Sequence, residues 1–397
     1  MLFADDIALV ADSRDNLQKQ LDIIKNYLEK KELELNAKKS VVLVFRSKGD
    51  VDSEVHFNFG GKVLEVNDEF VYLGVKFSAL RGMSRHVEDC NLRGNRLINM
   101  LLRSNLNQLA DMRIQKRVFQ TKVASSLHWG SEVWGFAKVA KLEVVQLRYF
   151  KRILGLKDSF SSVVLKGDLG LFSLRSVRLV RMVKFWEKII RLPRVRLLKA
   201  AYLESLKDGR RDSWSNQVKK ILYLCGLSEM WNEGKGPMDE TVSVWKEVQR
   251  TLNDQEIQEW QAHKDQSMSL RFYSQAKDGW GEEVYLKFGL NKEDLKNLLL
   301  VRGDSLDLGE RRKFLGKFRL AAGPYFCPMC GLVNENLFHF VSECEELSEL
   351  RNECFGRVFG SECWLIERMA ERNACAIKQL CKFLRLGTKY RESCLRG

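Results

Sequence analysis

The period of hydrophobic and polar positions along the 397-residue chain changes near residue 80. One helical stripe, formed by Leu17, Leu21, Ile24 and Leu28, follows two N-cap candidates, Asp12 and Ser13. Beyond about residue 81 the apolar positions recur at helical spacing. The pattern therefore predicts an α+β protein, with a small N-terminal portion of antiparallel strands plus helix and a largely α-helical remainder. Short apolar runs before residue 80 predict the strands at residues 1–3, 7–10, 41–45, 55–59, 62–66 and 70–77.

Glycines mark the tight connections of this pattern. Gly60 and Gly61 separate two of the apolar runs and predict a hairpin with a two-residue turn. Gly74 lies inside the last run, which predicts a strand glycine that lets another backbone approach closely, or alternatively a bulge or barrel corner. Farther along, polar stretches that contain glycine predict a linker or an insertion within residues 205–265.

Composition and charge narrow the class of protein. A hydrophobic content of 45% and a charged content of 30% are typical of a soluble globular protein. The net charge of +14 favours a polyanionic partner such as nucleic acid, although a merely solvated basic face remains the alternative. No apolar run reaches the roughly 18 residues of a membrane span, and the N-terminus does not resemble a secretory signal. We therefore expect an intracellular protein of the nucleus or cytoplasm.

Helices with one apolar and one basic face are predicted between about residues 81 and 200. Such a face suits the phosphate backbone of a nucleic acid, although basic faces also occur in proteins with no such partner. The predicted phosphate-contacting residues are Arg148, Lys151, Arg152, Arg178 and Arg181. Trp129 and Trp134 are interpreted as core rather than catalytic residues. Five further tryptophans are interpreted as core anchors rather than base-stacking groups; they are Trp214, Trp231, Trp245, Trp260 and Trp280.

Eight of the ten cysteines follow residue 326, which in an intracellular protein indicates metal binding rather than disulfides. Cys327, Cys330, His339 and Cys344 have the spacing Cys-x2-Cys-x8-His-x4-Cys. Three thiolates and one imidazole complete a tetrahedral zinc site with no open position, so the predicted Zn²⁺ is structural. The alternative is a set of reduced core thiols beside one histidine. The remaining late cysteines lack paired spacing, and most of them are expected to pack between helices; they are Cys354, Cys363, Cys375, Cys381 and Cys394.

Two adjacent carboxylates, Asp5 and Asp6, interrupt the apolar residues at the start of the chain. We expect them at a turn between two strands, where exposing acids beside an apolar hairpin favours a nearby cation. Magnesium is the expected ion, because hard cations take oxygen ligands.

Several stretches, in order, resemble the reverse transcriptases of non-LTR (LINE-type) retrotransposons. Residues 3–6, Phe-Ala-Asp-Asp, resemble the catalytic palm hairpin, and residues 36–40, Asn-Ala-Lys-Lys-Ser, are similar to the next palm motif. Residues 72–74 resemble the primer-grip hairpin, and residues 128–135 resemble an aromatic-Gly-Ser-Glu-x-Trp motif that follows the thumb. The cysteine cluster is similar to the zinc knuckle near the C-terminus of these proteins.

The resemblance implies roles for particular residues. Asp5 and Asp6 would hold Mg²⁺, and Lys39 would assist the departure of pyrophosphate. A primer grip would be formed by Tyr72, Leu73 and Gly74. The expected partners are RNA and DNA, as template and primer, with dNTPs as substrates.

The resemblance also implies an organisation into a partial palm, a helical thumb-like region, a helical connection or linker and a zinc-knuckle region, at residues 1–80, 81–200, 201–318 and 319–397. Only four residues precede Asp5, whereas the family places fingers and another palm aspartate upstream. We therefore expect the C-terminal portion of such an enzyme, inactive alone as a polymerase. The alternatives are a non-catalytic nucleic-acid-binding zinc protein derived from such an element, and a relic that folds poorly.

Overall fold

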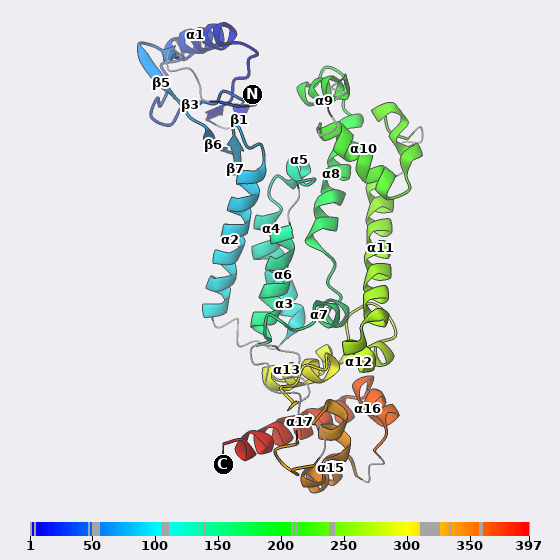
Figure 1. The fold of residues 1–397 in the computed structure, drawn as a ribbon. Coiled ribbons are helices and arrows are strands. Elements are labelled where there is room, and N and C mark those ends of the chain that lie inside the picture. Colours follow the sequence, from blue (N-terminus) through cyan, green and yellow to red (C-terminus); the bar gives the residue numbers. More distant parts are fainter. Residues whose placement is uncertain are drawn as a thin grey trace. The chain divides into compact units, whose positions relative to one another are not determined.

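The computed structural model divides the chain into two compact units, Met1–Cys90 and Asn91–Gly397 (Figure 1). Their boundary falls inside helix α2 (Ser84–Arg103). The structure describes residues 2–3, 5–46, 48–49, 56–104, 111–137, 140–207, 210, 213–237, 243–309, 326–332, 335–356 and 360–396.

Small sheets and one long helix make up the first unit. The elements before α2 are β1 (Leu2–Phe3), β2 (Asp6–Ile7), α1 (Arg14–Lys30), β3 (Val41–Val42), β4 (Phe57–Phe59), β5 (Lys62–Val66), β6 (Glu69–Tyr72) and β7 (Val75–Ser78). β1 pairs with β2 and β6 pairs with β7, each antiparallel. The third sheet has the order β3-β5-β4, in which β3 runs parallel to β5. The expectation of antiparallel strands alone is therefore wrong, because the β4–β5 hairpin leaves one edge of β5 open for β3.

Helix α1 packs on the three-stranded sheet. Its core contact joins Leu21 to Val42, Phe57 and Leu64, all of which are buried. Ser13 caps the helix, because its hydroxyl accepts a hydrogen bond from the Asn16 amide at 3.3 Å. The helical stripe and its cap thus confirm the sequence prediction. The strand predicted at 41–45 is shorter than expected and keeps ladder pairing only at Val41–Val42.

The two predicted glycine connections have different outcomes. Gly60 and Gly61 form the expected two-residue turn between β4 and β5, both with positive φ. Gly74 does not lie inside a strand: it follows Leu73 in the turn between β6 and β7, with φ of 78° and 50° respectively. Two consecutive positive φ angles are the requirement of a tight hairpin turn, and glycine meets it without strain. The prediction of a strand glycine at this position is wrong.

Hydrogen bonds and ion pairs fasten the β6–β7 hairpin to the first turns of α2. The Lys76 amide donates to Nδ1 of the buried His86 at 3.1 Å. Lys76 Nζ lies 3.0 Å from Asp89, and Arg85 lies 2.9 Å from Glu69. The hairpin and the start of α2 therefore form one locally braced element.

Helices and turns make up the described part of the second unit. In order they are α3 (Met112–Val118), η2 (Phe119–Ala124), α4 (Ser125–Leu127), α5 (Ser131–Trp134), α6 (Ala140–Ile153), α7 (Ser162–Leu169), α8 (Leu174–Ile190), α9 (Leu197–Lys207), α10 (Trp214–Leu224), η3 (Ser228–Gly234), α11 (Val244–Gln266), η4 (Met268–Leu270), α12 (Arg271–Ala276), η5 (Val284–Lys287), α13 (Lys292–Arg302), η6 (His339–Glu343), η7 (Glu345–Leu347), α15 (Ser348–Phe355), α16 (Glu362–Met369) and α17 (Ala374–Cys394). A mostly helical chain with small N-terminal sheets confirms the predicted α+β class at this level.

A hydrophobic core forms around α8, which runs beside α10 and α11 in Figure 1. The Trp186 indole is fully buried, stacks on Trp231 with 5.6 Å between ring centroids and donates to the Tyr202 hydroxyl at 2.9 Å. Val218 and Val248 close the same core from α10 and α11. Where the sequence favoured a linker, the described residues of 205–265 thus form helices that share a core with α8.

A second buried feature of this unit is a carboxylate, Asp168 at the end of α7, which is fully removed from solvent. Its oxygens accept hydrogen bonds from Tyr273 at 2.9 Å and Tyr285 at 2.7 Å. The Arg302 guanidinium spans both oxygens, at 2.7 and 3.1 Å, and also contacts Glu283 at 2.9 Å. Burial and then the Asp168 charge raise the pKa of both tyrosines, so they act as hydrogen-bond donors throughout the usual pH range.

None of the described helices combines the length and the apolar composition needed to cross a bilayer.

Replacing Arg302 with alanine is expected to lower the free energy of unfolding by about 3–5 kcal/mol, because Asp168 then stays buried without its counter-charge. Urea unfolding followed by circular dichroism measures this change. Arg250→Ala is the matched control, since its ion pair with Glu247 is largely exposed and is worth less than about 1 kcal/mol. Equally small losses in both variants would contradict a central role for the Asp168–Arg302 pair.

Candidate functional site

Four predicted metal ligands come together in the second unit. The ligand atoms of Cys327, Cys330, His339 and Cys344 all lie within 4.8 Å of one another. Cys327 Sγ lies 3.9 Å from Cys344 Sγ, and Cys330 Sγ lies 3.5 Å from His339 Nε2. Three of these residues are buried and Cys330 is half-buried. The spacing-based prediction of a Cys3His cluster is therefore confirmed as a geometric group.

Local backbone structure positions each pair of ligands. The Gly331 amide donates to the Cys327 carbonyl at 2.9 Å, and Gly331 has a φ of 69°, which closes the tight turn after Cys330. His339 begins the π-helical turn η6. Its backbone amide donates a hydrogen bond to the side-chain oxygen of Asn336 at 2.8 Å. The Cys344 amide returns to the His339 carbonyl at 2.8 Å. Each half of the motif is thus a short closed turn that presents two ligands.

The chemistry of this donor set fits zinc. Burial, followed by the neighbouring thiols of Cys327 and Cys330, raises the pKa of Cys344 to about 12. Three thiols this close cannot all ionise unless a cation replaces their protons. Among the described residues, none forms a hydrogen bond with His339 Nδ1, which lies 3.7 Å from Glu343, a carboxylate placed to orient the ring. The group can bind Zn²⁺ through four protein ligands, which is the arrangement of a structural site.

Buried arginine hydrogen bonds and one buried ion pair anchor this cluster to the surrounding helices. Arg351 donates to the backbone carbonyls of Val341 at 3.0 Å and Cys344 at 2.7 Å. Glu335 forms a buried bidentate pair with Arg391 of α17. The ligand-bearing turns are therefore held from outside the cluster as well as from within it.

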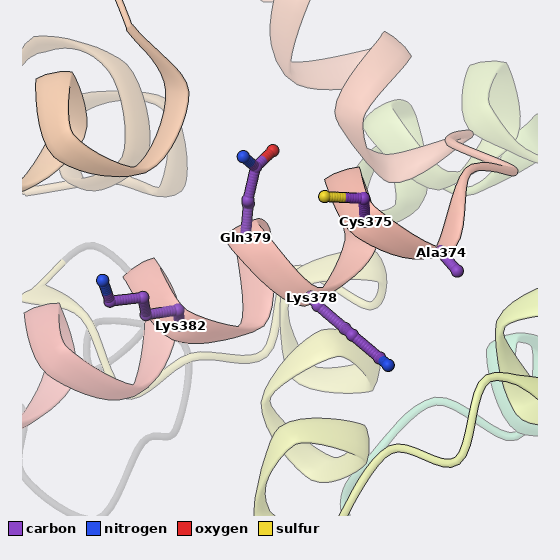
Figure 2. Close-up of a pocket in the computed structure, with 5 residues that line it drawn as sticks. All are labelled: Ala374, Cys375, Lys378, Gln379 and Lys382. Carbon is purple, nitrogen blue, oxygen red and sulfur yellow. The ribbon is translucent and has the colours of Figure 1, made fainter.

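The other late cysteines only partly follow the prediction. Cys354 and Cys381 are buried between helices, as expected, whereas Cys363 and Cys375 are exposed. Cys363 and Cys375 on α16 and α17 are thus not among the helix-packing thiols, and Cys394 is half-buried. Cys375 borders a shallow depression of about 430 Å³ together with Lys378, Gln379 and Lys382. Figure 2 shows that these side chains point in different directions, so they form no convergent binding site.

The predicted catalytic acids lie at the first hairpin. Asp5 occupies the turn, Asp6 pairs with Phe3 in the β1–β2 ladder, and both residues are exposed. Ala4, in the same motif, lies outside the described residues. Lys39 is exposed in the turn before β3, and within the described part of the chain no hydrogen bond or ion pair joins it to either acid. Nor do those residues bring a third His, Cys, Asp or Glu ligand beside Asp5 and Asp6.

The predicted primer-grip residues form the tip of the β6–β7 hairpin. Tyr72 ends β6 and is half-buried, whereas Leu73 and Gly74 occupy the exposed turn. The turn thus presents backbone rather than a bulky side chain at Gly74.

Two of the predicted phosphate contacts are wrong. Arg178 is fully buried and lies 2.9 Å from the Glu143 carboxylate. Lys151 is buried as well, and its ammonium donates to the Asp158 carbonyl at 2.5 Å. Both charges are committed to the interior, because their own helices turn these positions toward neighbouring elements. Neither side chain is available to a polyanion.

The other three predicted cations retain some solvent access. Arg148 is half-buried and donates to Asn95 at 2.5 Å, whereas Arg152 is exposed and donates to Asn99 at 3.0 Å. Arg181 has a side-chain exposure of 39%, with Glu132 at 3.6 Å. Among the five predicted residues, Arg152 is thus the best placed to reach a phosphate.

The two tryptophans of the residue 128–135 motif have opposite environments. Trp134 is fully buried, as predicted, whereas Trp129 is 56% exposed, so its assignment to the core is wrong. Between them, Gly130 adopts a φ of 69° and turns the chain out of α4. The neighbouring His128 is buried near Arg178 and Arg181; burial first, and then these charges, lower its pKa to about 3 and keep it neutral.

The sequence interpretation did not single out three exposed cations on α3 and η2, namely Arg113, Arg117 and Lys122. Three basic residues within one helical stretch were the sequence signal that could have indicated this exposed basic surface.

Comparisons with known proteins agree with the geometry of the first unit. Residues 1–77 match the family model described as reverse transcriptase (RNA-dependent DNA polymerase). The chain is also 24% identical over 263 residues to an uncharacterized transposon-derived protein of Caenorhabditis elegans, which covers 64% of this chain and 87% of the relative. No solved structure matches. These findings support a function related to reverse transcription, and that family implies divalent metal and a nucleic-acid template-primer.

We expect the full chain to hold one zinc ion, measured by elemental analysis, and Cys344→Ser to lose most of it because one of the four ligands is gone. Cobalt substitution gives a second readout, since thiolate-to-cobalt absorption should disappear in the same variant. Cys354→Ser is the matched control, a buried thiol outside the cluster. Apparent affinity should rise with pH, because the raised thiol pKa values mean that binding must displace protons. Affinity that does not change with pH would contradict thiolate ligation.

Arg152→Ala is expected to weaken nucleic-acid binding and to reduce the salt dependence by about one phosphate contact, without loss of stability, because the side chain is exposed. Arg178→Ala should instead lower the free energy of unfolding by about 1.5–3 kcal/mol through its lost charged hydrogen bonds. Salt titrations of an electrophoretic shift and urea unfolding separate the two effects. A loss of stability in Arg152→Ala together with unchanged stability and weaker binding in Arg178→Ala would contradict the exposed and buried positions of these two side chains.

Proposed function

We propose that this chain is part of the RNA-directed DNA polymerase of a non-LTR retrotransposon. The observation that carries the proposal is the exposed Asp5–Asp6 pair at a β-hairpin, within the residues that match the reverse transcriptase family. The transposon-derived relative adds support beyond the first unit, because it aligns with 64% of the chain.

In this proposal Asp5 and Asp6 bind Mg²⁺, which when bound would stabilise charge on the attacking and leaving oxygens of phosphoryl transfer. Both carboxylates are exposed and so can meet an incoming cation and triphosphate. Lys39, on the exposed turn before β3, supplies a cation for the pyrophosphate.

The β6–β7 hairpin is proposed to position the primer. Its tip exposes Leu73 and the backbone at Gly74, where no Cβ obstructs an approaching strand. Contacts of Lys76 with His86 and Asp89 brace the base of the hairpin. A braced hairpin holds a primer end more reproducibly than a free loop, which matters because small misplacements cost rate.

The second unit is proposed to grip the template-primer and to carry a structural zinc centre. Exposed Arg152 and the cations of α3 and η2 supply phosphate contacts. In the proposed organisation, residues 1–80 correspond to part of a palm, 81–200 to a thumb, 201–318 to a connection and 319–397 to the zinc region. RNA and DNA are the proposed partners, in the nucleus or the cytoplasm.

A second candidate function is a nucleic-acid-binding zinc protein without polymerase activity. The observation that favours it is that the described residues place no third carboxylate beside Asp5 and Asp6. Two-metal phosphoryl transfer needs ligands on both sides of the ions. The exposed cations and the Cys3His cluster do not depend on that missing ligand.

Primer extension on an RNA template, with Mg²⁺ and dNTPs, distinguishes these candidates. We expect the chain alone to give no extended product. Its described carboxylates at the first hairpin can contact two metal ions from one side only, and phosphoryl transfer needs ligands on both sides. An electrophoretic shift with the same RNA–DNA hybrid should remain and should weaken steeply with salt. Asp6→Asn is the matched variant, which should leave binding unchanged.

Product that disappears in Asp6→Asn would establish polymerisation by this chain and exclude the second candidate. If the hybrid does not bind at low salt, both candidates fail.

A further inference from the structure

An exposed row of cations in the second unit leads to the exposed indole of Trp129. The cationic row consists of Arg113, Arg117 and Lys122, all with solvent-exposed side chains on α3 and η2. Arg113 pairs with Asp111 at 2.9 Å. Within the described residues, no carboxylate lies at ion-pair distance from Arg117 or Lys122. Two charges of this row are therefore available to a polyanion.

Small hydroxyl residues follow Arg117 on one side of the helical segment that precedes Trp129. The Thr121 hydroxyl donates back to the Arg117 carbonyl at 2.8 Å, and the Ser125 hydroxyl donates back to the Thr121 carbonyl at 2.6 Å. These bonds place positions 117, 121 and 125 one turn apart on the same side of the helical segment, and Trp129 follows in the turn after α4.

The Trp129 backbone is held in place on both sides of the indole. Its carbonyl accepts a hydrogen bond from Nε1 of the fully buried Trp134 at 2.9 Å. The preceding carbonyl, of His128, accepts from Arg181 at 3.0 Å. The backbone of this turn is therefore restrained in the free protein, so a planar ligand can stack on the 56% exposed indole with little further loss of backbone entropy.

Charge and shape together favour single-stranded nucleic acid as the ligand. Phosphates complement Arg117 and Lys122, and an unpaired base offers the flat apolar face that an indole stacks on. In a duplex the bases stack on one another, so only a single strand or a frayed end presents such a face. Glu132, paired with Arg181 at 3.6 Å, is the carboxylate nearest in sequence to Trp129 and is already neutralised.

We propose that Trp129 is a stacking platform for an unpaired nucleobase of an RNA or DNA strand whose phosphates follow Arg113, Arg117 and Lys122. This site deepens the proposed function and rests on its nucleic-acid binding. It also gives the exposed aromatic residue of the 128–135 motif a physical role.

Fluorescence anisotropy of the full chain with labelled oligouridine or oligothymidine tests the site. Trp129→Ala should weaken binding about 5- to 100-fold while leaving the salt dependence unchanged, because stacking involves no counterions. Trp129→Phe should retain most of the affinity. Arg117→Ala combined with Lys122→Ala should instead reduce the slope of log affinity against log salt by about 1.4. Tyr223→Ala, which removes an aromatic side chain of 57% exposure on α10, is the matched control and should bind like the wild type.

An oligonucleotide that carries abasic sites makes the test specific for stacking. The wild type should lose affinity for it, and Trp129→Ala should then cost little more. Equal affinity of the wild type and Trp129→Ala for base-containing strands would overturn the site. So would a Trp129→Ala loss of affinity that is as large on abasic strands as on base-containing strands. A variant that changes only the self-association of the protein would overturn it as well. If the wild type shows no salt-dependent binding of nucleic acid, the proposed function itself fails, which is a separable outcome.

Discussion

The buried Asp168 carboxylate is the constraint on which the helical unit depends. A charge with no solvent access is stable only when its oxygens are fully hydrogen-bonded and paired. Arg302 and the hydroxyls of Tyr273 and Tyr285 meet that demand, and they come from three separate elements, α13, α12 and η5. The end of α7 and the end of α13 are therefore positioned by one ionic centre rather than by apolar contact alone. Gly167 allows this approach, because a Cβ there would lie 2.4 Å from the Tyr273 hydroxyl.

From α13, buried polar contacts continue to the Cys3His cluster. Arg302 also donates to the Met369 carbonyl of α16, and Asp294 of α13 pairs with Arg385 of α17 at 2.7 Å. Glu335, close in sequence to His339, pairs with Arg391 farther along α17. The metal-binding turns are thus attached to a helix that is already fixed by the larger core. A cation at the cluster would add to this order locally, whereas its loss would leave α13 and α17 with their own contacts.

Sequence patterns predicted whatever depends on local spacing and missed whatever depends on distant partners. The spacing of the cysteine motif was enough to predict the Cys3His group, because each pair of ligands lies on one short turn. By contrast, Arg178 and Arg152 look alike in a basic amphipathic stretch, yet Glu143, a partner 35 residues away in sequence, makes one of them internal. Trp129 and Trp134 differ in the same way, because the left-handed turn at Gly130 sends only one indole inward. Gly74 was misplaced because a hairpin as tight as β6–β7 leaves no polar break in the sequence.

The two units differ in how far their candidate sites are organised before any ligand binds. In the second unit, hydrogen bonds and ion pairs hold the Cys3His turns, and the backbone beside Trp129 is fixed by buried donors. In the first unit, Asp5 and Asp6 are exposed, and no hydrogen bond or ion pair among the described residues restrains either carboxylate. Precise placement of two metal ions needs restrained ligands, whereas binding a polyanion needs only accessible charge and a rigid surface. Under the proposed function, the second unit therefore supplies exposed charge on an ordered backbone for nucleic acid, while phosphoryl transfer at the first hairpin requires ligands that order Asp5 and Asp6.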